Sequence, residues 1–398
     1  MTGHTRSYEL KNGEKRWALV VYQGKRAGKD GKLRDSHRWI RGFRTKKAAQ
    51  VELNGILKSM DDGIYIEPSK QTLSEYLEHW LSTTKPNLAG KTFERYRQIV
   101  DRDIKPKLGT IALSKLQPVQ IAEFYSWALS FGRKQTEGGL SARTVLHIHR
   151  VLRKALQQAV VWQLRSTNPT DVVQAPRPVD KEMNALDEER SAWLIGAATG
   201  TLFYMPVMYA LCTALRRGEI LGQRWRDLDL EGGRLMVAQS LEQTRSGGIK
   251  FKIPKGKKRR SIGVPPVLAD ALKAHRIDQD KNRLLFGKDY KADLDLVIAL
   301  PDGSPWKPDS FSAAYADFSA RIGFKGIRFH DLRHSHASQL LRQRVPLKTV
   351  QERLGHASAS ITLNTYAHVL AGDDQQAMDV FEQRLRSAID KQTSRRAN

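Results

Sequence analysis

The stretch from Arg328 to Val369 reads RFHDLRHSHASQLLRQRVPLKTVQERLGHASASITLNTYAHV and concentrates polar side chains that can bind or attack a phosphate. His330 and Arg333 are three residues apart, so on a helix both project from one face. An arginine fork can hold two non-bridging phosphate oxygens, and an imidazole beside it can donate a hydrogen bond or accept a proton. The stretch therefore predicts a phosphate site in the neighbourhood of Tyr366.

The second half of this stretch predicts two short helices separated by a turn. Apolar residues at helical spacing lead up to Gly355, which suits a helix C-terminus and leaves His356 in the turn beyond it. Ser358 is in position to cap the next helix. Tyr366 then lies about two turns into that helix, above the turn that carries His356.

The same residues allow a different interpretation as a metal site. His330, Asp331 and His334 form the pattern H-D-x-x-H, which is close to the zinc-protease helix pattern H-E-x-x-H, and His336 lies nearby. Against a metal site, aspartate is shorter than the usual glutamate base, no third ligand follows at the expected spacing, and Arg333 would place a cation against the metal. A further alternative is that these histidines are ordinary core or surface residues.

Composition points to a polyanionic partner. The chain has 398 residues, a formal net charge of +25 and a sequence pI of about 10.1. Such a balance fits nucleic acid, because many Lys and Arg contacts to phosphates release counterions. The alternatives are a solvated basic surface, or a ribosomal or membrane-surface protein.

The single cysteine, Cys212, excludes an internal disulfide and a thiolate-rich zinc site. The N-terminal residues contain no apolar signal core, and no run of apolar residues is long enough to span a membrane. We therefore expect a cytoplasmic protein without a membrane partner.

The N-terminal part of the chain predicts a small basic module, over residues 1–65. Residues 1–60 contain 15 Lys and Arg against 5 Asp and Glu. Trp17–Tyr22 and Ser36–Phe43 read as partner strands, and a helix follows from Thr45 toward Met60. Such a module could bind DNA, or could be a basic appendage with a structural role.

Residues 70–168 predict a small helical bundle, because apolar residues recur there at helical spacing in four segments. Basic residues on the outer faces of these helices could grip a phosphate backbone. A proline-rich linker follows at about Asn168–Asp180.

The remaining chain, residues 180–390, predicts one larger mixed domain. Its expected elements are helices at Glu188–Ala198 and Met205–Leu215, strands near Arg234–Gln239, Ile249–Ile253 and Arg260–Val264, and a last helix at Asp374–Asp390. The polar residues 391–398 are expected to form a disordered tail.

Two further motifs in this domain concern arginine and lysine. Arg216 follows an apolar run and precedes Glu219 by three residues, which suits a partly buried guanidinium that is oriented by a carboxylate. Lys255 lies in Pro254-Lys-Gly-Lys-Lys-Arg-Arg260, a basic turn between two strands that could enter a DNA groove or be a solvated hairpin tip.

Taken together, these motifs resemble those of the tyrosine recombinases, and in particular the phage-type integrases. The resemblance rests on Arg216 in T-A-L-R-R-G-E, Lys255 in the basic β-hairpin, His330-x-x-Arg333, L-G-H ending at His356, and Tyr366. The one departure is Ala214, where the family usually has Gly. The resemblance implies a multidomain α+β fold: a small N-terminal three-stranded sheet plus helix that binds arm-type DNA, an all-α, SAM-like core-binding bundle, and a mixed, mainly helical catalytic domain with a small antiparallel sheet.

The resemblance also implies a role for each motif residue. Tyr366 would attack the scissile phosphate to give a 3′-phosphotyrosyl bond, while Arg216 and Arg333 would clamp its non-bridging oxygens. Lys255, or a neighbouring lysine of the same turn, would protonate the leaving 5′-oxygen. His330 would serve as acid or base near the tyrosine, and His356 would donate to the phosphate. No metal, ATP or other cofactor is implied.

The implied partner is double-stranded DNA, bound at core and arm attachment sites by a homotetramer that passes through a Holliday junction. An excisionase or other directionality factor and a host DNA-bending protein are possible further partners. Besides integration or excision of a phage or mobile element, the alternatives are a Xer-like resolvase, a type IB topoisomerase that relaxes DNA, and a DNA-binding protein without catalysis.

Overall fold

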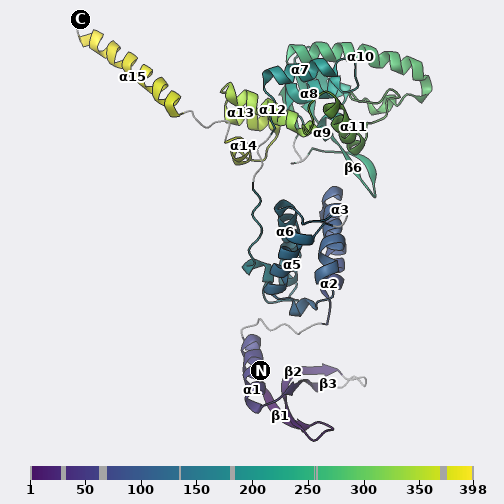
Figure 1. Ribbon diagram of the computed structural model, residues 1–398, viewed down its shortest axis with the longest axis vertical. Helices are drawn as coiled ribbons and strands as arrows, with labels where there is room; N and C mark the ends of the chain where they lie inside the picture. Colours follow the sequence, from purple (N-terminus) through teal and green to yellow (C-terminus); the bar gives the residue numbers. More distant parts are fainter. Residues whose placement is uncertain are drawn as a thin grey trace. The chain divides into compact units, whose positions relative to one another are not determined.

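The computed structural model of the chain describes residues 2–27, 33–61, 70–133, 136–179, 184–254, 256, 259–367 and 374–396 (Figure 1). Its contacts divide the chain into two compact units, residues 1–179 and 180–398.

The N-terminal unit begins with a three-stranded antiparallel sheet in the order β1-β2-β3, followed by one helix. The elements are β1 (Gly3–Glu9), β2 (Lys15–Ala27), β3 (Leu33–Phe43) and α1 (Lys46–Asp61). Leu19 and Val21, on one face of β2, pack with Leu53 of α1 in a small core. The predicted three-stranded sheet with its helix is confirmed, and β1 is the strand that strand propensity alone did not identify.

The same unit continues as an all-helical bundle. Its helices are α2 (Leu73–Thr84), α3 (Gly90–Ile99), α4 (Lys105–Leu108), α5 (Pro118–Phe131) and α6 (Ala142–Val161), with a π-helical segment between α3 and α4. Thr72 and Glu75 form a capping box that starts α2. The apolar faces of the helices share one core, with Trp80 and Tyr76 among its largest fully buried side chains.

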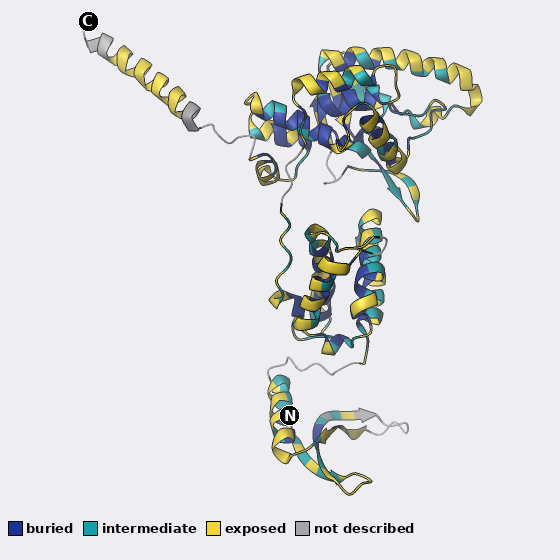
Figure 2. Ribbon diagram, viewed as in Figure 1, coloured by how far each residue is buried: buried dark blue, intermediate teal, exposed yellow. Residues whose placement is uncertain are grey.

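The second unit is mainly helical and has the largest core of the molecule, which appears as the dark-blue interior in Figure 2. Its first helices are α7 (Glu188–Ala198), α8 (Tyr204–Thr213) and α9 (Arg217–Leu221), and α10 (Pro266–Phe286) and α11 (Pro308–Arg321) follow the sheets. Helix α8 is nearly all buried, and it packs against α7, α10 and α12 (Phe329–Arg342). It therefore forms the centre of this unit.

Two small antiparallel sheets lie in the second unit. One has the order β4-β5-β8, and the other pairs β6 with β7. The strands are β4 (Leu228–Asp229), β5 (Arg234–Val237), β6 (Ser240–Thr244), β7 (Gly248–Lys252) and β8 (Arg260–Gly263).

The pairing of these strands corrects the predicted basic hairpin. Strands β7 and β8 flank the basic segment as expected, but β7 pairs with β6 while β8 pairs with β5. The strands on either side of the segment therefore belong to two different sheets. The physical reason is that the alternating side chains of β8, with Ile262 buried, complete the core side of the β4-β5-β8 sheet.

The last helices are α13 (Leu347–Leu354), α14 (Ala359–Tyr366) and α15 (Asp374–Arg396). Two expectations are corrected here. Ser358 occupies the N-cap position of α14 without a side-chain cap hydrogen bond, and α15 continues to Arg396, so the predicted tail at 391–398 is helical as far as it is described. Among the helices that the structure describes, none combines the length and apolar character needed to cross a membrane.

Candidate active site

Arg333 is a nearly buried cation, with 2% of its surface exposed. It lies in the second turn of α12, and its two terminal nitrogens donate to the backbone carbonyls of Ala214 and Leu354. Burial, together with the nearby charge of Arg216, lowers the pKa of Arg333 to about 9, so the guanidinium remains charged at neutral pH. The side chain is thus fixed by carbonyls that carry no opposing full charge.

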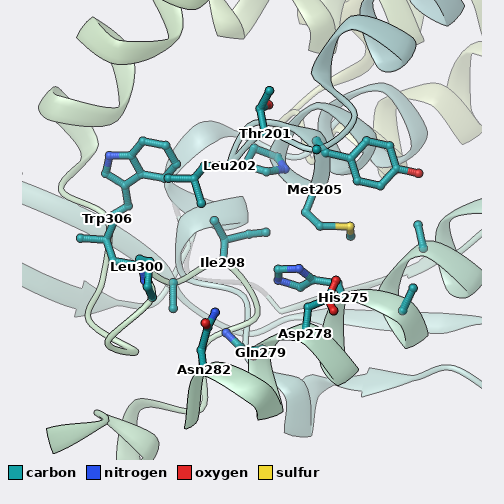
Figure 3. Close-up of a pocket in the computed structure, with 17 residues that line it drawn as sticks. Thr201, Leu202, Met205, His275, Asp278, Gln279, Asn282, Ile298, Leu300 and Trp306 are labelled. Atoms are coloured by element: carbon teal, nitrogen blue, oxygen red, sulfur yellow. The ribbon is translucent and has the colours of Figure 1, made fainter. Parts of the chain in front are cut away.

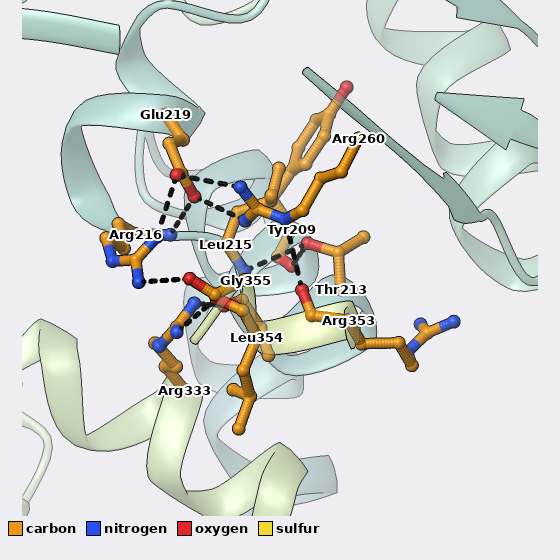
Figure 4. A network of polar contacts seen from close by, with 11 residues as sticks. Tyr209, Thr213, Leu215, Arg216, Glu219, Arg260, Arg333, Arg353, Leu354 and Gly355 are labelled. Atoms are coloured by element: carbon orange, nitrogen blue, oxygen red, sulfur yellow. Dashed lines mark hydrogen bonds and ion pairs between the residues drawn. The ribbon is translucent and has the colours of Figure 1, made fainter. Parts of the chain in front are cut away.

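Arg216 lies beside Arg333 because the two guanidiniums bind adjacent peptide groups. Arg216 is the N-cap residue of α9, and its Nη2 donates to the carbonyl of Gly355 at 2.9 Å, one residue after the carbonyl that Arg333 binds. Figure 4 shows both side chains converging on this corner at the end of α13. The corner turns sharply because Gly355 adopts a left-handed conformation, with φ +62°.

Glu219 orients the guanidinium of Arg216, as the three-residue spacing of the two side chains predicts. Its carboxylate accepts from Arg216 Nη1 at 3.1 Å and from the Arg216 backbone N–H at 2.9 Å. A second cation, Arg260 of β8, donates to both oxygens of the same carboxylate at 3.0 and 2.7 Å. Burial alone would raise the pKa of Glu219, but Arg260 and Arg216 outweigh it and lower the pKa to about 2.

Tyr366 is fully buried at the end of α14, and its hydroxyl lies 2.8 Å from Nδ1 of His334. Burial raises the pKa of Tyr366 to about 12, although the charge of Arg333 acts in the opposite direction. Burial and the neighbouring His330 lower the pKa of His334 to about 4, so its ring is neutral at pH 7 and can accept the phenol proton in a hydrogen bond.

The two other predicted histidines, His330 and His356, lie close to Tyr366 and His334. The exposed His330 lies one turn before His334 on α12, with the two rings edge to face at 5.0 Å. His356 follows the Gly355 corner, and its Nδ1 lies 2.9 Å from Oγ1 of Thr362, which is one turn before Tyr366 on α14. Lys255 and its neighbours Lys257 and Lys258 lie outside the described residues.

The structure thus places five of the six predicted site residues at the start of α9, in the first two turns of α12, just after α13 and at the end of α14. Two further residues of the site, His334 and Arg260, could not be assigned these contacts from the sequence. His334 was considered only as a metal ligand, and Arg260 only as part of a basic turn. The spacing of His334, four residues after His330 and one after Arg333, was a signal, but nothing in the sequence linked Arg260 to Glu219.

One cavity of this unit adjoins the site, and another lies apart from it. A cavity of about 570 Å³ has Arg216, Arg217, Arg328 and His330 in its lining together with apolar residues such as Ile327 and Phe329, so part of its wall is basic. The other, of about 380 Å³, is lined by residues such as Met205, His275 and Trp306 and by none of the predicted site residues (Figure 3).

His334 of the H-D-x-x-H pattern and the nearby His336 are engaged in other contacts. His334 binds the hydroxyl of Tyr366, and His336 has Nδ1 at 2.6 Å from the carbonyl of Leu211 and Nε2 at 3.4 Å from Arg353 Nε. Within the described ranges, no group of three or more His, Cys, Asp or Glu side chains is arranged to hold a metal ion.

Comparison with known proteins matches two family models to the chain. The model described as the phage integrase family covers residues 181–372, and the phage integrase N-terminal SAM-like domain covers residues 72–127. The chain is 28% identical to a XerC-like tyrosine recombinase of Caldanaerobacter subterraneus, over 94% of this chain and 97% of the relative. It is 26% identical to the integrase of Mycobacterium phage L5, over 88% and 87% of the two chains.

Solved structures share the fold. The Tn1549 transposon integrase in complex with transposon right-end DNA superposes with a TM-score of 0.67 at 20% identity, covering 78% of this chain and 99% of that one. A λ integrase dimer bound to a core site gives a TM-score of 0.54 at 18% identity, covering 90% and 93%.

Proposed function

This chain belongs to the phage integrase family of tyrosine recombinases, and we propose that it cuts and rejoins DNA at specific sites through a covalent bond to Tyr366. The observation that supports this most directly is the pair of guanidiniums on the adjacent carbonyls of Leu354 and Gly355, next to a tyrosine with an imidazole partner. Two fixed cations beside a nucleophile suit a phosphodiester, whose charge grows as the tyrosine attacks.

In the proposed reaction, the Tyr366 oxygen attacks the scissile phosphorus, its proton passes to Nδ1 of His334, and the 5′-oxygen leaves. A 3′-phosphotyrosyl bond forms as the P–O5′ bond breaks, and a second 5′-hydroxyl later reverses the step on the partner strand. Arg216 and Arg333 bind the non-bridging oxygens, and His356 donates a further hydrogen bond. The proton for the leaving oxygen comes from a lysine of the 255–258 segment, of which Lys255 is our first choice.

We assign His330 to the phosphate side of the site, near Arg216 and the basic cavity. Although His330 is exposed at the surface, desolvation of its ring by the surrounding residues and the charge of Arg333 lower its pKa, which favours the neutral ring, able to act as acceptor or donor. The partner of the tyrosine hydroxyl is His334. This differs from the role that the resemblance suggested for His330.

We further propose that the chain acts as a homotetramer on two DNA sites in the bacterial cytoplasm. The fold is shared with a λ integrase tetramer that was solved on a Holliday junction, at a TM-score of 0.52 and 19% identity. The helical bundle and the N-terminal module would bind core and arm sites, and an excisionase and a DNA-bending protein would set direction. The recombination itself would integrate or excise a mobile element, or resolve one in the manner of the XerC-like relative.

The function is tested with the DNA that the protein selects. Fragments that become covalently attached to the wild-type protein are sequenced, and the shared site is rebuilt as a duplex with a nick near the crossover, so that the cleaved piece diffuses away. The wild-type protein should accumulate a covalent adduct in the presence of EDTA, and Tyr366→Phe should give none. An adduct that disappears on chelation would overturn the proposal and favour the metal interpretation of the histidines.

A further inference from the structure

Arg260 is the best-bound cation near the site, yet the proposed reaction does not use it. Its side chain is 14% exposed, and both terminal nitrogens are committed to the two oxygens of Glu219. Its Nε lies 3.3 Å from the carbonyl of Arg353, in the last turn of α13. These contacts hold the guanidinium of Arg260 against Glu219 and α13, and its side chain is less exposed than that of Arg216, at 14% against 27%.

Without Arg260, the negative charge of Glu219 would cancel the positive charge of Arg216. The carboxylate is 1% exposed and accepts from Arg216, so a lone Glu219–Arg216 pair would carry no net charge. An arginine that is neutralised in this way would attract a phosphate weakly. With Arg260 on the same carboxylate, the three groups carry one net positive charge, and the excess lies on the side of Arg216, whose side chain is 27% exposed.

A steric contact ties Arg260 to the same corner. A Cβ added at Gly355 would lie 2.9 Å from Cζ and 3.0 Å from Nε of Arg260, so the guanidinium covers the open side of this glycine. Arg216 donates a hydrogen bond to the backbone carbonyl of the same glycine. Arg260, Glu219, Arg216 and Gly355 therefore form a closed set of neighbours, which Figure 4 shows.

We propose that Arg260 is a positioning residue for strand cleavage: it neutralises Glu219 so that the charge of Arg216 remains available to the scissile phosphate. The inference rests on the proposed function and deepens it. Two other roles are possible for a residue in this place. Arg260 could anchor the neighbouring lysine segment 255–258, or it could serve stability alone.

Substrates with altered phosphates separate these roles. In a methylphosphonate, a neutral methyl group replaces one charged non-bridging oxygen, so less positive charge is needed from Arg216. In a 5′-bridging phosphorothiolate, the leaving group is a thiolate, which departs without a proton and so does not need the lysine. The rate of adduct formation is measured with each substrate at saturating protein.

On the ordinary phosphodiester, Arg260→Ala should lower the cleavage rate by about tenfold or more, because one partner of a buried charge pair is lost. The defect should shrink on the methylphosphonate and persist on the phosphorothiolate. Arg260→Lys, which keeps the charge but loses the fork, should fall between the two. Rescue by the phosphorothiolate alone, or an equal defect on all three substrates, would overturn the proposal.

A double variant guards against a folding defect. Arg260→Ala leaves a buried carboxylate short of a partner, whereas Arg260→Ala with Glu219→Gln removes the charge that requires one. The double variant should cleave the phosphodiester faster than Arg260→Ala alone, and a rate no faster would contradict the proposal. Arg259→Ala, at the exposed neighbour, controls for lost charge in the basic segment and should show no methylphosphonate rescue.

The outcome is independent of the test of the function. If the wild-type protein gives no adduct, or if Tyr366→Phe still gives one, the proposed reaction fails whatever Arg260 does. If those two results are as expected, the substrate series reports on Arg260 alone.

Discussion

Gly355 is the residue on which the two guanidiniums of the site depend. Its left-handed backbone presents its carbonyl to Arg216 directly after the carbonyl of Leu354 that Arg333 binds. A side chain there would be strained by the positive φ and would also meet Arg260.

Gly355→Ala should therefore impair cleavage more than it impairs folding. The left-handed conformation costs about 1–2 kcal/mol for a residue with a Cβ, and displacement of Arg260 adds a loss in cleavage rate. The control is Gly323→Ala, because Gly323 has φ +84° but open space where its Cβ would lie. We expect the two variants to lose similar amounts of unfolding free energy, but only Gly355→Ala to lose cleavage. Equal cleavage rates in the two variants would contradict the role given to Gly355.

Ala214 shows a related departure. It ends α8 with φ +56°, in a conformation that favours glycine, and its carbonyl accepts from Arg333. The family usually has glycine before this leucine and arginine. The structure gives the physical reason for that preference, and this chain retains the conformation with an alanine.

His334 gives a second prediction at this scale. His334→Ala should slow adduct formation, because the Tyr366 hydroxyl loses its acceptor and its orientation. His334→Asn, whose side-chain oxygen can take the place of Nδ1, should retain more activity than the alanine variant. Both are compared with the wild-type protein by single-turnover cleavage. If asparagine and alanine behave alike, the hydrogen bond has no part in positioning the tyrosine.

Helices α13 and α14, here called the platform, share a small apolar cluster that includes Tyr366. Tyr366 packs in a cluster with Val350, Leu354 and two residues of α12, which is separate from the main core of this unit. The position of the tyrosine is therefore set by a few apolar contacts.

Leu354→Ala should loosen this platform. The leucine is fully buried, so its truncation should cost about 2–5 kcal/mol of unfolding free energy and should lower cleavage as well. Leu363→Ala, on the exposed side of α14 at 45% exposure, should change stability by only about 0.5 kcal/mol. Chemical denaturation measures the unfolding free energy of both variants. Equal destabilisation of the two would show that the buried leucine does not stabilise this part of the fold more than the exposed one does.

Some of these elements could be predicted from the sequence, whereas the pairing of the strands could not. Helices α7 and α13 and the four apolar stripes of the bundle follow from local periodicity, which a sequence displays directly. The separation of β7 from β8 could not be predicted, because strand pairing depends on distant partners in β5 and β6. The motif spacing likewise identified Arg333 and Tyr366, but the bond from Tyr366 to His334 joins residues 32 apart and depends on how α14 folds back onto α12.

At the scale of the whole molecule, buried neutral histidines make the stability of the catalytic unit depend on pH. Burial is the main cause that lowers the pKa values of His334, His336 and His356 from the ordinary 6.5 to about 4. Between these values the unfolded chain binds more protons than the folded one. Stability is therefore complete above about pH 6.5 and declines as the pH falls toward 4.

The thermal midpoint of the protein should accordingly fall steadily between pH 7 and about pH 4.5. Glu219 adds a further loss only at lower pH, as its carboxyl titrates between the ordinary 4.5 and about 2. A midpoint that stays constant from pH 7 to pH 5 would show that these histidines are not buried as described.

The central claim is that one tyrosine forms the bond to DNA, and peptide mapping of the trapped adduct tests it most directly. The adduct is digested with protease and nuclease, and the peptide that retains a nucleotide is identified by mass spectrometry. The account predicts a single modified peptide with the phosphate on Tyr366. A nucleotide on Tyr290, Tyr315 or any other residue, or an adduct of unchanged yield in Tyr366→Phe, would contradict it.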